Sequence, residues 1–248
     1  MMQRLIVLLA VFSLVSCNRK MSVTYDVDEY RVSLLEGNLK TVELYYRKFG
    51  KIALEDFGYE KLKMYNPLEV ALVGKNYDIA DFLIAKGTDV NAKTPSGLGN
   101  IIHTFAYREE PENIQYLISK GAQTKNLNPP LGIIICSSSN MELIKLMADG
   151  AIDINEKDED GETPLYTACG YGNLQVVKFL VEHGADINSR TNENATPFLI
   201  SVCRGNIEVA EYLILQGADT TVADLEGYDA LWCANELGIR IKGLNDSY

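Results

Sequence analysis

Residues 161–188 hold the clearest pattern of apolar and polar positions in the chain. The first part predicts a short helix whose apolar positions run to Ala168, and Gly172 begins the turn that follows it. Residues 176–181 then predict a second helix with a broad apolar face, which ends at Gly184 because a left-handed residue suits that position. Neither helix can bury its apolar face alone, so the pattern predicts neighbouring units of the same kind.

The same pattern recurs at a constant spacing. The opening Thr163-Pro164-Leu165 returns 33 residues later as Thr196-Pro197-Phe198. In five units the second residue of the opening lies 20 residues before the glycine that ends the second helix. These pairs are Pro67 and Gly87, Ile101 and Gly121, Pro130 and Gly150, Pro164 and Gly184, and Pro197 and Gly217. A spacing that is kept five times predicts a repeat architecture.

A helix–turn–helix unit of 33 residues that opens on Thr-Pro-Leu resembles the ankyrin repeat. The resemblance implies an all-α ankyrin-repeat solenoid of about seven helix–turn–helix units with short hairpin-like loops. The terminal units are expected to be atypical, because one face of each must meet water. We place the ankyrin repeat domain at 27–248, with an N-terminal cap at 27–50, repeats at about 62–93, 96–124, 125–155, 159–190 and 192–223, and a C-terminal cap at 225–244.

Two places depart from the repeat pattern. Glu109-Glu110-Pro111 replaces the glycine turn between the helices of the unit that begins at Asn100. Because proline is favoured in the first turn of a helix, we expect the second helix of that unit to begin near Pro111. Residues 51–65 are longer than a standard connection, and we expect either an extra turn of helix or an extended loop there.

The start of the chain has the pattern of an export signal. Arg4 precedes an apolar run at residues 5–15, which is broken only by Ser13. That run is shorter than the roughly 20 residues needed to cross a bilayer, and it fits a secretory signal peptide at 1–16. Leu14-Val15-Ser16-Cys17 resembles the lipobox of bacterial lipoproteins, which implies cleavage before Cys17 and lipidation of its thiol and new amino group.

The lipobox leads us to expect a lipoprotein that is anchored by Cys17 to the membrane of the cell envelope and faces the periplasm or the cell exterior. Residues 17–26 would form a polar tether between the lipid and the repeats. The alternative is an ordinary signal peptide with a cysteine nearby.

The net charge bears on the partner. The chain has 23 Lys and Arg against 34 Asp and Glu; loss of residues 1–16 removes one Arg, which leaves 22 against 34, or −12. Phosphate binding needs clustered cations, so this balance argues against nucleic acid. It favours a protein partner with a basic surface, although solubility alone also explains it.

Four cysteines follow Cys17, and all lie in predicted first helices: Cys136, Cys169, Cys203 and Cys233. Packed helices lie roughly 8–10 Å apart, whereas a disulfide needs Cα atoms about 4.4–6.8 Å apart. We therefore expect small buried thiols, with a Cys169–Cys203 bridge as the least implausible exception.

The sequence predicts no catalytic, metal or cofactor site. His103 occupies the histidine position of the ankyrin unit, where the resemblance implies bonds to neighbouring backbone. His183 precedes Gly184, where a basic side chain suits a helix C-terminus. The segment from Glu156 to Thr167 lacks the acid that a calcium-binding EF-hand needs in its twelfth position.

The resemblance implies a concave contact surface made of hairpin tips and the exposed faces of first helices. The residues that map to it are Tyr65, Tyr107, Arg108, Glu159, Asp160, Glu162, Tyr171, Arg190, Glu193, Arg204, Glu226 and Tyr228. Tyrosine and arginine are enriched at interface hot spots, and an acidic tip would steer a partner. The alternative for the tyrosines is that they pack on neighbouring units.

These patterns favour a non-catalytic, monomeric module that binds another protein through the concave groove. One hypothesis is an envelope scaffold that recruits a protein to the membrane. Another is a periplasmic immunity or inhibitor protein that neutralises a toxin or an enzyme. An enzyme with an unrecognised site would require a polar pocket with perturbed ionisable groups.

Overall fold

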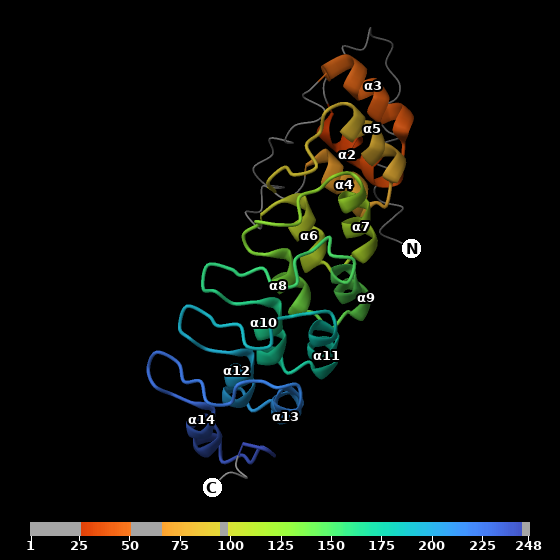
Figure 1. The fold of residues 1–248 in the computed structure, drawn as a ribbon. Coiled ribbons are helices and arrows are strands. Elements are labelled where there is room, and N and C mark those ends of the chain that lie inside the picture. Colours follow the sequence, from red (N-terminus) through yellow and green to blue (C-terminus); the bar gives the residue numbers. More distant parts are fainter. Residues whose placement is uncertain (1–25, 51–65, 95–98, 245–248) are drawn as a thin grey trace, which may run out of the picture.

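The computed structural model describes residues 26–50, 66–94 and 99–244. Its helices stack into an elongated solenoid, with the first helices of the units in one row and the second helices in another (Figure 1). The units pair α2 (Val27–Glu36) with α3 (Leu39–Phe49), α4 (Pro67–Val73) with α5 (Tyr77–Ala85), α6 (Ile101–Tyr107) with α7 (Pro111–Ser119), α8 (Leu131–Cys136) with α9 (Met141–Ile144) and η2 (Lys145–Met147), α10 (Pro164–Tyr171) with α11 (Leu174–Glu182), and α12 (Pro197–Cys203) with α13 (Ile207–Leu215). A last helix, α14 (Ala230–Leu237), completes seven units and confirms the predicted fold class.

The Thr-Pro openings start first helices for two physical reasons. The hydroxyl oxygens of Thr163 and Thr196 accept hydrogen bonds from backbone N–H groups that have no partner inside the helix. Proline follows at the first helical position, where its missing N–H costs nothing. Gly184 ends the second helix of its unit with a φ of 90°, in the left-handed region that its position predicts.

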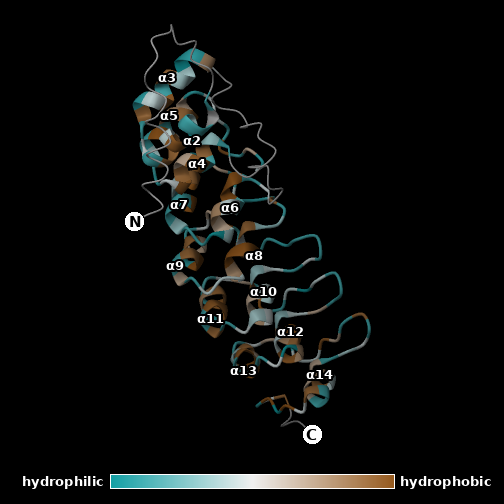
Figure 2. Ribbon diagram, turned by 180° about the vertical axis from the view of Figure 1, so that it is seen from behind, coloured by the Kyte–Doolittle hydropathy of each residue, from teal (hydrophilic) through white to brown (hydrophobic). Residues whose placement is uncertain are grey.

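A continuous apolar core runs between the two rows of helices. Leu165 and Ala168 of α10 face Val177 and Leu180 of α11, and all four are fully or almost fully buried. In Figure 2 the hydrophobic colours gather on the helices, and the loops are largely hydrophilic. Each large apolar side chain buried in this way stabilises the fold by about 1.5–3 kcal/mol. Since the core is shared between units, each unit depends on its neighbours.

Asparagines tie successive units together at the turns. The amide nitrogen of Asn76 donates to the carbonyl oxygens of Leu34 and Leu35 in the preceding unit, at 2.7 and 2.8 Å. Asn206 does the same toward the end of α10, with distances of 2.8 and 3.0 Å. These bonds satisfy carbonyl groups that a helix end leaves without partners.

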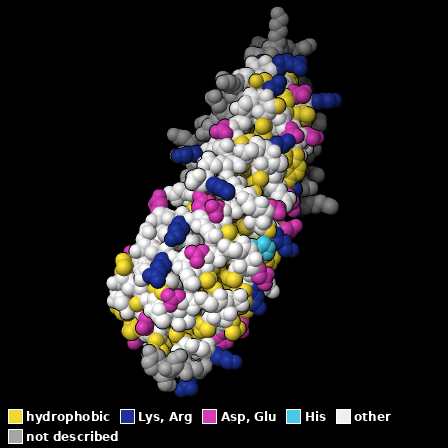
Figure 3. Space-filling model, viewed as in Figure 1, with side chains coloured by type: hydrophobic (Ala, Val, Ile, Leu, Met, Phe, Trp, Pro, Cys, Tyr) yellow, Lys and Arg dark blue, Asp and Glu magenta, His cyan; other side chains and the backbone are white. Residues whose placement is uncertain are grey.

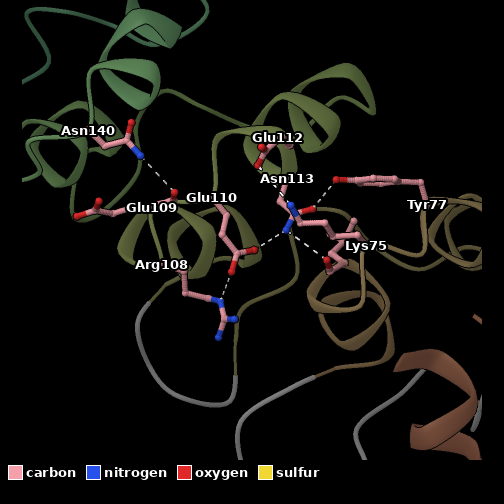
Figure 4. Close-up of polar contacts among 9 residues, drawn as sticks. Lys75, Tyr77, Arg108, Glu109, Glu110, Glu112, Asn113 and Asn140 are labelled. Carbon is pink, nitrogen blue, oxygen red and sulfur yellow. Dashed lines mark hydrogen bonds and ion pairs between the residues drawn. The ribbon is translucent and has the colours of Figure 1, made fainter. Parts of the chain in front are cut away.

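The degenerate unit, formed by α6 and α7, keeps this link to the preceding unit with different residues (Figure 4). As predicted, α7 begins at Pro111, and Glu109 makes the turn with a φ of 57° where the units of α2, α10 and α12 have glycine. Glu110 occupies the N-cap position where the units of α5 and α13 have the linking asparagine. The buried Asn113 makes the link instead: its amide nitrogen donates to the carbonyl oxygen of Leu72 at 3.2 Å and to the carboxylate of Glu110 at 2.6 Å. The hydroxyl of Tyr77 donates to the Asn113 side chain at 3.1 Å.

The cysteines correct the sequence-based expectation in part. Cys136 and Cys169 are buried thiols, as predicted. Cys203 and Cys233 form a disulfide, with Cα atoms 5.0 Å apart, so the predicted thiols at these positions and the Cys169–Cys203 alternative are wrong. Cys203 ends α12, whereas Cys233 is three residues earlier in the register of α14. The usual distance between helix axes misled the prediction, because the Cα atoms of these two cysteines lie well inside it.

The segment 51–65, for which we expect a helical turn or a loop, lies outside the described residues, as do the predicted signal peptide and Cys17.

Candidate functional site

A groove of about 570 Å³ crosses the first helices of neighbouring units. Its lining mixes polar and apolar side chains, and the apolar part includes Ile133 from α8, the ring of Tyr166 from α10 and Ile200 from α12. Four of the residues predicted from the sequence line it: Tyr107, Glu162, Tyr171 and Arg204. The stack of first helices therefore brings residues of four units, from α6 to α12, into one surface.

The tyrosines of the groove project into solvent. The side chain of Tyr171 is 68% exposed and that of Tyr107 is 49% exposed. Packing against neighbouring units therefore does not account for these two residues. An aromatic side chain held in this way offers a large contact area with few rotatable bonds, which is the property that makes tyrosine effective at interfaces.

Other predicted residues hold the hairpin tips together. The carboxylate of Glu159 accepts a hydrogen bond from Asn128 at 2.6 Å, and its carbonyl oxygen accepts one from Asn192 at 2.7 Å. Arg190 donates to the side chain of Asn194 at 3.0 Å. These contacts fix the shape of the tips, so Glu159 and Arg190 support the wall of the groove rather than line it.

The remaining predicted residues lie away from the groove lining. Arg108 forms an ion pair with Glu110 at 2.7 Å. Tyr228 is 37% exposed and its ring lies 4.2 Å from that of Trp232, toward the C-terminal end of the stack. The side chains of Asp160, Glu193 and Glu226 are exposed on the tips, and Tyr65 lies outside the described residues.

Sequence reasoning missed Tyr166 and the isoleucines of the floor. Tyr166 stands at the histidine position of its unit, three residues after the N-cap, so the ankyrin pattern suggested a role inside the fold. Ile133 and Ile200 follow one residue later in their own units. Residues at that position are half-buried in the units of α8, α10 and α12, so a comparison across these units would have found the two isoleucines.

The charges of the groove interact across two units. Burial raises the pKa of Glu162, the nearby carboxylates of Asp158 and Asp160 raise it further, and Arg204 opposes them. Burial also raises the pKa of Tyr166, with Glu162 adding to the rise and Arg204 reducing it. Within the described part of the chain, no hydrogen bond or ion pair engages the side chains of Glu162, Tyr166 or Arg204. Their polar ends remain open to a ligand.

The histidine position acts structurally in the unit of α6, as the sequence predicts. Nδ1 of His103 accepts the backbone N–H of Asn100 at 2.8 Å, so Nε2 carries the proton and donates to the carbonyl oxygen of Pro129 at 2.9 Å. Burial lowers the pKa of this imidazole. Because Pro129 lines the groove, His103 fixes one end of the groove floor from beneath.

Among the described residues, no group of three or more His, Cys, Asp or Glu side chains is placed to hold a metal ion. None of the described helices is long and apolar enough to cross a membrane.

Comparison with known proteins agrees with this architecture. A family model of ankyrin repeats in three copies matches residues 102–191 and again 131–224. Among solved structures, the chain is similar to the ankyrin repeat domain of Bcl-3, a unique member of the IkappaB protein family, with a TM-score of 0.68 and 18% identity over 82% of this chain and 92% of that one. At that identity the likeness concerns the fold. No curated protein matches the sequence. The repeated unit, the stacked helix pairs and these matches identify the fold of the chain as an all-helical ankyrin repeat domain.

Proposed function

We propose that this chain binds a partner protein through the groove between α6 and α12, without catalysing a reaction. Ankyrin repeats form protein–protein interaction modules and are usually not catalytic. The observation that carries the proposal is the pair of exposed tyrosines, Tyr107 and Tyr171, beside the apolar floor of Ile133 and Ile200. Exposed aromatic side chains around an apolar centre match the anatomy of an interface hot spot.

The double variant Tyr107→Ala, Tyr171→Ala tests this proposal. The folded protein is immobilised, exposed to envelope extract, and the captured proteins are identified by mass spectrometry. We expect the variant to lose the main captured protein, because truncation of a hot-spot residue weakens binding by about 2 kcal/mol or more. The melting temperature should stay the same, since neither ring is buried in the core.

Leu215→Ala provides the matched control, because Leu215 is 81% exposed at the end of α13, away from the groove lining. Capture that survives the tyrosine substitutions, or that fails equally in the Leu215 control, would remove the groove as the binding site. The identity of the captured protein also separates the two roles considered from the sequence. A structural envelope protein supports a scaffold, and a toxin or enzyme supports an immunity or inhibitor protein.

We further propose that a lipid on Cys17 anchors the module to the membrane of the cell envelope. The lipobox sequence and the preceding apolar run support this location. Dual acylation would give a stable anchor, whereas one acyl chain binds only marginally. In cells that receive labelled palmitate, the wild type should carry the label and sediment with membranes, while Cys17→Ser should carry none. An unlabelled wild type that is recovered without membranes would refute the anchor.

A further inference from the structure

Resting on the proposed function, we propose that the groove selects a partner segment that carries one lysine or arginine, whose cation lies between the carboxylate of Glu162 and the ring of Tyr166. The neighbouring apolar side chains of the segment would cover Ile133, Ile200 and the ring of Tyr171. The proposal specifies the partner segment as one cationic side chain beside apolar ones, and it makes Glu162 the residue that determines specificity.

The first argument is the state of Glu162 itself. Its side chain is partly buried at the edge of the groove, with Asp158 and Asp160 close enough to disfavour its charged form. No described residue donates a hydrogen bond or forms an ion pair with its carboxylate. A nearby cation stabilises the charged form of a carboxyl group that is partly desolvated beside like charges. When the partner supplies that cation, this stabilisation contributes to the free energy of binding.

The second argument concerns the kind of cation. The described residues offer no cluster suited to a metal ion, whereas the groove offers aromatic rings and aliphatic groups next to the acid. Lysine and arginine carry an apolar stem below the charge, so the stem can cover Ile133 or Ile200 while the charge reaches Glu162. The rings of Tyr166 and Tyr171 add a cation–π attraction, which contributes about 0.5–2 kcal/mol.

The third argument comes from Arg204, at the end of α12. Its charge acts on both Glu162 and Tyr166, although it makes no ion pair with another described residue. A second cation on the partner would be repelled there, whereas a carbonyl or carboxylate oxygen would be attracted. The groove therefore distinguishes a segment with a single cation from a generally basic surface. The face drawn in Figure 3 shows the same mixture, with acidic and basic side chains lying among hydrophobic ones over the C-terminal half.

A library of random 12-residue peptides displayed on phage provides the probe. Peptides are selected in parallel on the immobilised wild type, on Glu162→Gln, on the double tyrosine variant, and on Glu208→Gln, which removes an exposed acid from α13 as the matched control. Wild type and control should enrich peptides with one lysine or arginine near an apolar residue. Glu162→Gln should lose that enrichment and bind the best wild-type peptide at least about tenfold more weakly, which is about 1.4 kcal/mol.

The outcomes separate this inference from the proposed function. Peptides that depend on Tyr107 and Tyr171 but show no enrichment of lysine or arginine would overturn the cation preference and leave the groove as the binding site. A selection in which no peptide depends on the two tyrosines would overturn both. Arg204→Gln adds a further check: it should admit peptides with two cations, and an unchanged preference there would remove Arg204 from the specificity argument.

Discussion

Glu69 and His103 occupy the same position in neighbouring units, three residues after the N-cap, but they meet different surroundings. Both ring nitrogens of His103 have backbone partners. Glu69 uses one oxygen to accept the N–H of Asn66 at 3.3 Å, while its other oxygen is buried close to the hydroxyl of Thr104. Burial raises the pKa of Glu69 to about 7, so the fold favours the protonated carboxyl.

Glu69 should make stability fall as the pH rises. The folded state holds its proton up to about pH 7, whereas the unfolded chain releases it near 4.5. The stabilisation is therefore complete below pH 4.5 and is lost as the pH rises through 7. Glu69→Gln keeps the acceptor for Asn66 and should stabilise the protein at pH 8 by about 1–3 kcal/mol, with little effect at pH 4.

Thermal unfolding of both proteins between pH 4 and 8 measures this difference. Glu208→Gln, at an exposed acid of α13, serves as the control, and removal of this surface carboxylate should not stabilise the protein at pH 8. Equal pH profiles for the wild type and Glu69→Gln would show that the carboxyl titrates normally in the fold.

Single residues of the site were harder to predict than the surface to which they belong. Tyr107 and Tyr171 could be found because exposed aromatic residues at the end of a first helix break the apolar pattern. Tyr166 was missed because the role of its position changes between units, from a buried carboxyl in Glu69 to a half-exposed ring. That change depends on which neighbours cover the position, and a residue type alone does not reveal them.

At the level of the elements, glycines mark both the interior and the end of helices, with opposite energetic consequences. Gly184 has a φ of 90° and open space around it, so a side chain there would meet backbone strain rather than a clash. Gly170 lies within α10 in ordinary helical geometry, and a Cβ there would make a normal contact with Ile200 at 3.5 Å.

The same substitution should therefore have opposite effects at these two glycines. Gly184→Ala should destabilise the protein by about 1–2 kcal/mol. Gly170→Ala should stabilise it by up to about 1 kcal/mol, because alanine loses less backbone entropy in a helix. Urea unfolding followed by circular dichroism measures both. A shift of the same sign in both variants would contradict the assigned backbone geometries.

The helices themselves were predictable from two local signals: the Thr-Pro or Asn opening and the glycine 20 residues later. Both have a direct physical basis in capping and in left-handed geometry, so they hold even where the sequence between them varies. The turn of the degenerate unit was harder, because Asn113 takes over a contact that other units make from the N-cap. Only the packing of α7 on α4 brings that amide to Leu72.

At the scale of the whole molecule, the constant spacing predicted the stacked architecture, but not the contacts between distant units. The groove depends on side-chain directions in four units. The repeat spacing therefore predicted which surface carries the groove, but it did not predict which residues line it. The Cys203–Cys233 bridge depends on how closely α14 approaches α12 at these two positions, where the Cα atoms lie 5.0 Å apart. Helix spacing taken as an average could not give that distance.

The disulfide should stabilise the C-terminal end of the stack, where α14 is the only helix described after α13. Cys233→Ser should lower the free energy of unfolding by about 2–4 kcal/mol, since a cross-link restricts the unfolded chain. Reducing agent should lower the melting temperature of the wild type and leave that of the variant unchanged. Alkylation followed by mass spectrometry provides an independent check, and two reactive thiols in the oxidised wild type would refute the bridge.

The bridge also changes how the chain would respond to mechanical force. A solenoid pulled from its ends can lose its units one after another, and each loss releases the contour length of one unit. The bond between residues 30 apart withholds the chain between them from this extension. At roughly 3.3–3.6 Å per residue, about 100 Å of length stays hidden until the bond is reduced. The segment that contains α13 and the start of α14 would therefore contribute no length under load while the disulfide is intact.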